Sequence, residues 1–315
     1  MLSLRLISPA DLSVTLVDLL RAHPGAAHLV VLPGAAVDPP GDVLMADLAR
    51  EAVSDVITAI EQVAGDRCAI TLETVDTTVS QYADAAEEAS PGRGTDAVVW
   101  EEVEARTGEE SELSASFLAL LVIATLLAAI GLMLDSPVLV VGAMVVGPEF
   151  GPVAGLTVAL AERRTELARR SLRALLIGFP VAIAASFLLT VVIRLTAGLP
   201  GPYTAEQRPL TEFISKPDGY ALVVALLAGV AGVISLTSAK SAALVGVAVS
   251  VTTVPAAADI GVAAAAGNGA ECAGAAGQLL VNLVALVLAG GLTLALRRRA
   301  AQRRAGKAPV RPGRG

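Results

Sequence analysis

Six apolar segments dominate the chain after residue 112, and each is long enough to cross a lipid bilayer. They lie near residues 113–134, 137–160, 174–196, 220–238, 241–265 and 277–296. A transmembrane helix needs about 20 apolar residues to cross the hydrocarbon core. Hydrophobic residues make up 54% of the chain and charged residues 17%, whereas soluble domains have about 25% charged residues. The sequence therefore excludes a purely soluble protein and predicts an α-helical polytopic membrane protein with six spans.

Basic residues predict how these segments are oriented. Arginines cluster at 163–173, and the tail 297–315 is basic without a single acidic residue. Because basic loops next to a membrane stay in the cytoplasm, both clusters predict cytoplasmic N- and C-termini and a bacterial inner (plasma) membrane protein. The longest loop then lies outside, bordered by Tyr203, Phe213 and Tyr220, as expected of an interfacial aromatic belt.

Residues 1–76 alternate between strand-like and helix-like runs. Their order is β-α-β-β-α-β, which is typical of ferredoxin-like α+β domains. The predicted core consists of Leu4, Leu6, Leu16, Leu19, Val30, Leu32, Ile57, Ile60, Ile70 and Leu72. This segment has neither a phosphate-binding loop nor a nucleophile motif. Its role is therefore assembly or capping of the membrane part, or alternatively the sensing of a ligand.

These patterns divide the chain into four parts. We expect a cytosolic ferredoxin-like domain at 1–76 and an acidic connector at 77–112, whose last part, with Trp100, is an amphipathic helix. A six-helix transmembrane domain at 113–296 and a basic cytosolic tail at 297–315 follow.

Composition also excludes several function classes. The first 112 residues are strongly acidic, and the basic tail has no aromatic residue for stacking bases, so we expect no nucleic-acid partner. His23 and His28 lack neighbouring ligand patterns, so we expect no metal and no cofactor. Cys68 and Cys272 fall on opposite sides of the predicted membrane, so we expect no disulfide between them. No nucleophile–base set is visible, and we expect no enzyme.

The two halves of the membrane part are weakly similar. Three segments precede the outer loop and three follow it, so an internal repeat must be inverted, in a 3+3 arrangement. Residues 131–160 resemble residues 233–266, because each begins with a polar break, reaches Val-Gly and then meets proline. The alternative is a chance likeness in an Ala/Val/Gly-rich chain.

Prolines and carboxylates mark candidate binding residues in the second and fifth segments. Proline breaks or kinks a helix, and carboxylates inside a membrane are costly and are functional candidates by default. The candidates for binding a ligand or ion are Glu149, Asp259, Pro148, Pro152, Pro255, Gly147 and Gly151. Two alternatives remain open: the breaks lie near the interface, where acidic residues are tolerated, and the glycines serve tight helix packing.

The run AIGLMLDSPVLVVGAMVVGPEFGP at 129–152 resembles the signature of a hydrophobic bacterial and archaeal family catalogued as domain of unknown function 389. The likeness covers about 113–290, and its last part contains Asn282, which we add to the candidate residues. Glu149 and Asp259 stand where this family usually has other residues, and Ala256 where a second proline is common. The resemblance implies a fold and a membrane location but no activity.

Together these features predict a transporter or channel for a small solute or ion. Broken helices two and five would form the central site, with Glu149 and Asp259 binding a cation or proton. The alternative is a non-transporting membrane sensor or assembly scaffold whose cytosolic head binds a ligand or partner. The small-residue helix faces and the head predict a homo-oligomer of unknown order in the lipid bilayer.

Overall fold

The computed structural model describes residues 1–75, 77–90, 99, 103, 107–196, 203, 208–215, 218–237 and 243–305, with the backbone alone at 213, 215, 243–252 and 301–305. The chain forms two compact units, the first mainly Met1–Val103 and the second mainly Glu104–Leu236 and Lys240–Ala300. The predictions for Trp100, the side chain of Phe213, the Lys240–Ser241 break and the end of the tail lie outside the described residues.

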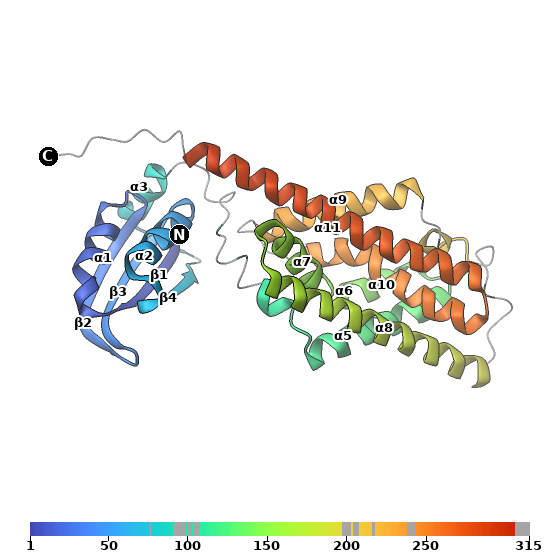
Figure 1. The fold of residues 1–315 in the computed structure, drawn as a ribbon. Coiled ribbons are helices and arrows are strands. Elements are labelled where there is room, and N and C mark those ends of the chain that lie inside the picture. The colour runs from blue at the N-terminus through green and yellow to red at the C-terminus, as the bar shows by residue number, and fades with distance from the viewer. Residues whose placement is uncertain are drawn as a thin grey trace. The chain divides into compact units, whose positions relative to one another are not determined.

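The first unit is a four-stranded antiparallel sheet with two helices on one face (Figure 1). Its elements are β1 (Leu2–Ser8), α1 (Ala10–Ala22), β2 (Ala26–Val37), β3 (Pro40–Leu48), α2 (Val53–Ala64) and β4 (Ala69–Thr74). The strands lie in the order β2-β3-β1-β4. The predicted β-α-β-β-α-β order is therefore confirmed. A further helix, α3 (Gln81–Ala89), follows and is capped by Ser80, whose side chain accepts a hydrogen bond from the Tyr82 N–H.

Alternating burial along the strands creates the core of this unit. Leu4 and Leu6 on β1 are buried against Leu16 of α1 and Ile60 of α2, because successive strand residues point to opposite faces. Val99, far along the chain, joins the same core.

Two residues of the predicted core are outside it. Val30 and Leu32 on β2 are each 44% exposed. They pair with Met45 and Val43 of β3, and Met45 is itself exposed. Partners in an antiparallel pair share a face, so these side chains lie on the face of the sheet that α1 and α2 leave uncovered.

The second unit consists of helices. They are α5 (Ala115–Met133), α6 (Pro137–Val146), α7 (Phe150–Glu162), α8 (Thr165–Thr196), α9 (Gly219–Leu236), α10 (Ala243–Ala266) and α11 (Gly269–Ala305). Four of these, α5, α8, α9 and α11, are long and apolar enough to cross a membrane. The pair α6 and α7, bent by 58°, makes a fifth candidate span. The described apolar stretch of α10, Thr253–Ala266, is shorter than these candidate spans.

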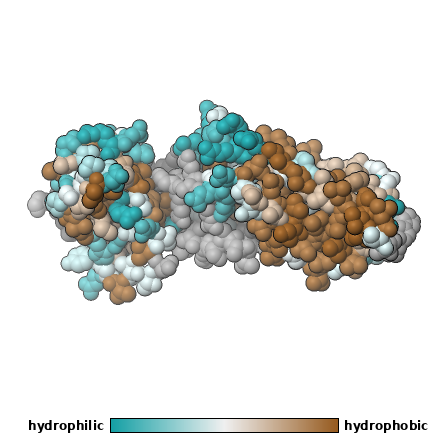
Figure 2. Space-filling model, turned by 90° about the horizontal axis from the view of Figure 1, so that it is seen from below, coloured by the Kyte–Doolittle hydropathy of each residue, from teal (hydrophilic) through white to brown (hydrophobic). Residues whose placement is uncertain are grey.

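Large apolar side chains cover the outside of this unit (Figure 2). Leu176 and Leu188 of α8, Leu227 of α9 and Leu288 of α11 are all exposed. Soluble proteins rarely expose apolar patches of this extent. Helix length and surface together indicate a multi-pass membrane protein.

The helix boundaries differ from the sequence prediction at several places, and α11, expected near 277–296, runs from Gly269 to Ala305. The third apolar segment was expected to begin at 174, but α8 begins at Thr165. Its first turns include Arg169 and Arg170, which pair with Glu166 at 3.0 and 3.2 Å. Such ion pairs three and four residues apart support a helix beyond the apolar part.

The expected break at Pro255 is wrong, because α10 is one helix with Pro255 inside it. Val254, Ala256 and Ala257 around it are almost fully buried in the core of the second unit. α10 contacts α5, α6, α7, α8 and α9, and neighbouring helices can hold a proline-containing membrane helix together.

Candidate functional site

The sequence Gly147-Pro148-Glu149 separates α6 from α7. A residue before proline is driven away from the helical conformation, and Gly147 is extended, with φ −64° and ψ 126°. Pro152 falls in the first turn of α7, where its missing N–H breaks no helical hydrogen bond. The two prolines therefore end one helix and allow the next to begin in a new direction.

Glu149 lies fully buried at this break. Its Oε1 accepts a hydrogen bond from the Thr253 hydroxyl of α10 at 2.8 Å. A Cβ at Gly147 would collide with Glu149 Oε2 and lie 3.0 Å from a methyl group of Val254. Gly147 therefore leaves the space that the Glu149 carboxyl group occupies.

Gly151 and Gly155 allow other parts of the chain to approach α7 closely. Ser111, just before α5, donates to the Gly151 carbonyl at 3.2 Å. A Cβ at Gly151 would strike the backbone carbonyl oxygen of Glu110, and one at Gly155 would lie 2.6 Å from Ser171 Oγ. The break is thus packed against the segment that leads into α5.

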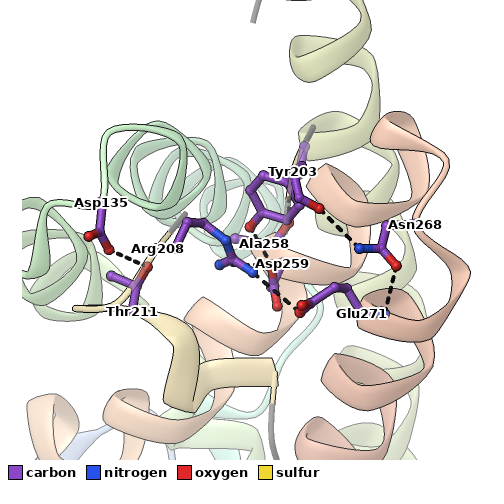
Figure 3. Close-up of polar contacts among 9 residues, drawn as sticks. Asp135, Tyr203, Arg208, Thr211, Ala258, Asp259, Asn268 and Glu271 are labelled. Atoms are coloured by element: carbon purple, nitrogen blue, oxygen red, sulfur yellow. Dashed lines mark hydrogen bonds and ion pairs between the residues drawn. The ribbon is translucent and has the colours of Figure 1, made fainter. Parts of the chain in front are cut away.

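A second polar centre surrounds Asp259 of α10 (Figure 3). Asp259 is fully buried, and the Tyr203 hydroxyl donates to its Oδ1. Arg208 Nη1 lies 3.4 Å from the same oxygen, and Arg208 Nη2 donates to Glu271 Oε2 at 3.3 Å. The guanidinium also lies over the Tyr203 ring, 3.9 Å from its centre.

Hydrogen bonds attach the α8–α9 connection, which carries Tyr203 and Arg208, to two helix turns (Figure 3). At the α10–α11 turn, Asn268 Nδ2 donates to the Tyr203 carbonyl at 3.0 Å. At the α5–α6 turn, Asp135 accepts from the Thr211 hydroxyl at 2.9 Å and from the Leu210 N–H at 3.3 Å. Tyr203, Leu210 and Thr211 of the connection therefore lie against these two turns.

The predicted site residues are divided between separate places. Gly147, Pro148, Glu149, Gly151 and Pro152 meet at the α6–α7 break, whereas Asp259 lies at the second centre, with Tyr203 and Arg208.

The remaining candidates lie on α10 and α11. Asp259 follows Thr253 by six residues, which is roughly 9 Å along a helix axis. Pro255 is buried on α10 between them. Asn282 of α11 is buried, and its Oδ1 accepts a hydrogen bond from Gln278 Nε2 at 3.1 Å.

Sequence reasoning missed Thr253, Arg208 and Glu271 as partners of the two carboxylates. Arg208 is 51 residues from Asp259 in the chain and 63 from Glu271, and no local pattern pairs residues so far apart. In the described part of the chain, no group of three or more His, Cys, Asp or Glu is placed to hold a metal ion.

Comparisons with known proteins show similarity to one family in this helical region. The family model described as "Domain of unknown function (DUF389)" matches residues 144–288, which include both polar centres. The uncharacterized protein MJ0678 of Methanocaldococcus jannaschii is 25% identical over 178 residues, 56% of this chain and 53% of that protein. The chain thus spans about half the length of this curated relative. No solved structure matches the chain. Residues 144–288 are therefore similar to the family described as domain of unknown function DUF389.

Proposed function

We propose that the helical unit is a transporter or channel that passes a small solute or ion by way of Glu149 at the α6–α7 break. The observation that carries this proposal is a fully buried carboxyl group between two prolines, hydrogen-bonded to Thr253 of α10. An ionisable group inside a membrane unit is costly and tends to mark a pathway for ions or substrates. Interrupted helices that line such sites are typical of transporters.

The proposed topology has six spans, with α10 as the fifth, and cytoplasmic termini. Arg298 of α11 donates to Glu162, the last residue of α7, at 2.5 Å. This contact brings the basic end of α11 next to Arg163 and the other arginines that follow α7. Because both basic segments lie at one end of the helices, the positive-inside rule favours a cytoplasmic location for that end.

The acidic first unit is then a cytosolic, ferredoxin-like domain, and the protein resides in a bacterial inner membrane as a homo-oligomer. Because α10 is continuous at Pro255, the two halves do not share a matching helix break. The proposed inverted repeat is therefore limited to the order and direction of the spans. The α6–α7 break therefore forms the pathway, and Glu149 binds the cation or proton.

Flux measurements on the purified full-length protein in liposomes test this proposal. Protons, alkali cations, amino acids and organic cations form the panel, and we expect one of them to cross in the wild type. Glu149→Gln should abolish this flux, and Thr253→Val should reduce it. Glu162→Gln is the matched control, because Glu162 lies at the end of α7 and pairs with Arg298. Wild-type liposomes impermeable to the whole panel, or an unchanged flux with Glu149→Gln, would overturn the proposal.

A non-transporting sensor or assembly scaffold is the second candidate function. It is favoured by the face of the first unit's sheet that α1 and α2 leave uncovered, where Val30, Leu32 and Met45 are exposed. Such a face can bind a partner or another copy of the chain. If no solute crosses and Leu32→Glu dissociates the purified assembly, the scaffold is the better account.

A further inference from the structure

The Arg208 guanidinium fills a buried cage made by Asp259, Glu271 and the ring of Tyr203 (Figure 3). The side chains of Arg208, Asp259 and Glu271 are 4%, 0% and 12% exposed. The two carboxylates come from α10 and α11, whereas Arg208 comes from the connection between α8 and α9. Helices thus provide the acidic side chains, and a connecting segment provides the cation.

Arg208 fits this cage loosely. Its contacts to Asp259 and Glu271 measure 3.4 and 3.3 Å, whereas charge-assisted hydrogen bonds usually measure about 2.7–2.9 Å. Among the described residues, Arg208 Nε and Nη1 and Asp259 Oδ2 have no hydrogen-bond partner, although all three atoms are buried. A buried arginine kept only for structure normally satisfies its donors. This geometry is that of a side chain that can be exchanged for another cation.

The composition of the cage indicates which cation it prefers. Among the described residues, two carboxylates face one guanidinium. An aromatic face next to carboxylates suits guanidinium and alkylammonium groups, which gain from both. A divalent metal needs more oxygen ligands, six to eight for Ca²⁺, and the described residues offer no metal-binding group of three or more acidic, His or Cys side chains.

We propose that Asp259, Glu271 and Tyr203 form a binding site for a small organic cation with a guanidinium or alkylammonium group. Arg208 occupies this site as a tethered competitor and leaves when such a cation binds. Its departure removes one of the contacts that hold residues 208–211, while the hydrogen bonds from Leu210 and Thr211 to Asp135 remain. The site specifies the substrate class of the proposed transport function and rests on it, but binding itself requires no flux.

Equilibrium dialysis of the purified full-length protein with radiolabelled guanidinium tests the site. A tethered group competes at an effective concentration near millimolar, so we expect Arg208→Gln to bind guanidinium about tenfold more tightly than the wild type. Adding Asp259→Asn to Arg208→Gln should abolish this binding. Arg194→Gln should behave as the wild type, because Arg194 donates to the carbonyl of Ala265 rather than to a carboxylate. The site is refuted if Arg208→Gln binds no more tightly than the wild type, or if Asp259→Asn leaves its binding intact.

A second measurement keeps Arg208 in place, in case its replacement prevents folding. Ile214 on the α8–α9 connection is buried, and Cys68 and Cys272 are free thiols that serine would replace. In that background, Ile214→Cys should react faster with a water-soluble thiol reagent when guanidinium chloride is added at millimolar concentration. Sodium chloride at the same concentration should have no effect. Equal rates in both salts would contradict the displacement of Arg208.

The two proposals fail in different ways. Guanidinium binding without flux of any solute would overturn transport and leave this site intact. A flux that depends on Glu149, in a protein that binds no guanidinium in either assay, would overturn only this site.

Discussion

At the scale of single residues, Gly151 determines how closely the segment before α5 approaches the α6–α7 break. A Cβ at this position would strike the backbone of Glu110, and backbone cannot rotate away as a side chain can. Gly151→Ala should therefore destabilise the protein by about 1–3 kcal/mol, measured by thermal unfolding in detergent. Gly142→Ala is the control, because nothing lies within 4 Å of its Cβ. Equal unfolding midpoints for the two variants would contradict the packing described here.

His23 gives the first unit a pH dependence. Burial lowers the pKa of His23 below its usual value, and the nearby charge of Asp55 opposes this shift more weakly. Its Nδ1 also accepts from the Gly25 N–H at 3.2 Å, which a proton on that nitrogen would prevent. The folded state thus favours neutral imidazole.

The pKa of His23 is lower in the folded state than in the unfolded state. The stabilisation that neutral His23 provides is therefore present above the unfolded-state pKa and is lost as the pH falls. The free energy of unfolding should decrease between about pH 7 and about pH 5. Urea denaturation of the full chain, followed by circular dichroism of the sheet unit, measures it. In His23→Gln, which keeps a hydrogen-bond acceptor, the decrease should be smaller, and an identical pH profile would contradict the assignment.

At the scale of elements, proline has opposite effects in two places: it accompanies a break between α6 and α7, but α10 continues through it. Pro148 follows an extended glycine and precedes a second proline, and the helix breaks there. Pro255 stands among small residues that are packed on several sides, and the helix continues. The sequence predicted a break at both, because the local pattern contains the prolines but not the neighbours that hold α10 together.

The predictability of the candidate site follows the same division. Glu149 and its glycines are close in sequence, so the motif itself indicated that they act together. The sequence indicated only half of the Asp259 centre: Asp259 stood out as a carboxylate in an apolar segment, while no local pattern marked Arg208 or Glu271. Their pairing depends on how α10, α11 and the α8–α9 connection meet, which periodicity does not encode.

Within the first unit, Val99 packs on the same core as β1, α1 and α2. A fragment ending at residue 103 should therefore unfold at a higher temperature than one ending at residue 76. Leu16→Ala in the longer fragment should cost about 2–5 kcal/mol, because Leu16 is fully buried. Thermal unfolding of both fragments, followed by circular dichroism, measures these differences. Equal unfolding temperatures for the two fragments would exclude a role for Val99 in the core.

At the scale of the whole molecule, the proposed topology predicts which segments face the outside of the cell. In a chain without Cys68 and Cys272, Leu210→Cys should react with an impermeant thiol reagent on intact cells. Arg169→Cys should react only after the cells are opened, because it lies in the basic segment assigned to the cytoplasm. The reverse pattern of labelling would invert the topology.

The central claim is that the α6–α7 break forms a pathway for a solute, and a pathway must admit water. Glu149→Cys, in the chain without native cysteines, tests this directly, because a thiol reacts with small charged reagents only where water reaches it. Ala128→Cys is the control, since Ala128 is fully buried in the core of the helices. Right-side-out and inverted membrane vesicles expose the two sides in turn. The account predicts that Cys at position 149 is modified from at least one side while Cys at 128 is not. Equal lack of modification at both positions from both sides would contradict it.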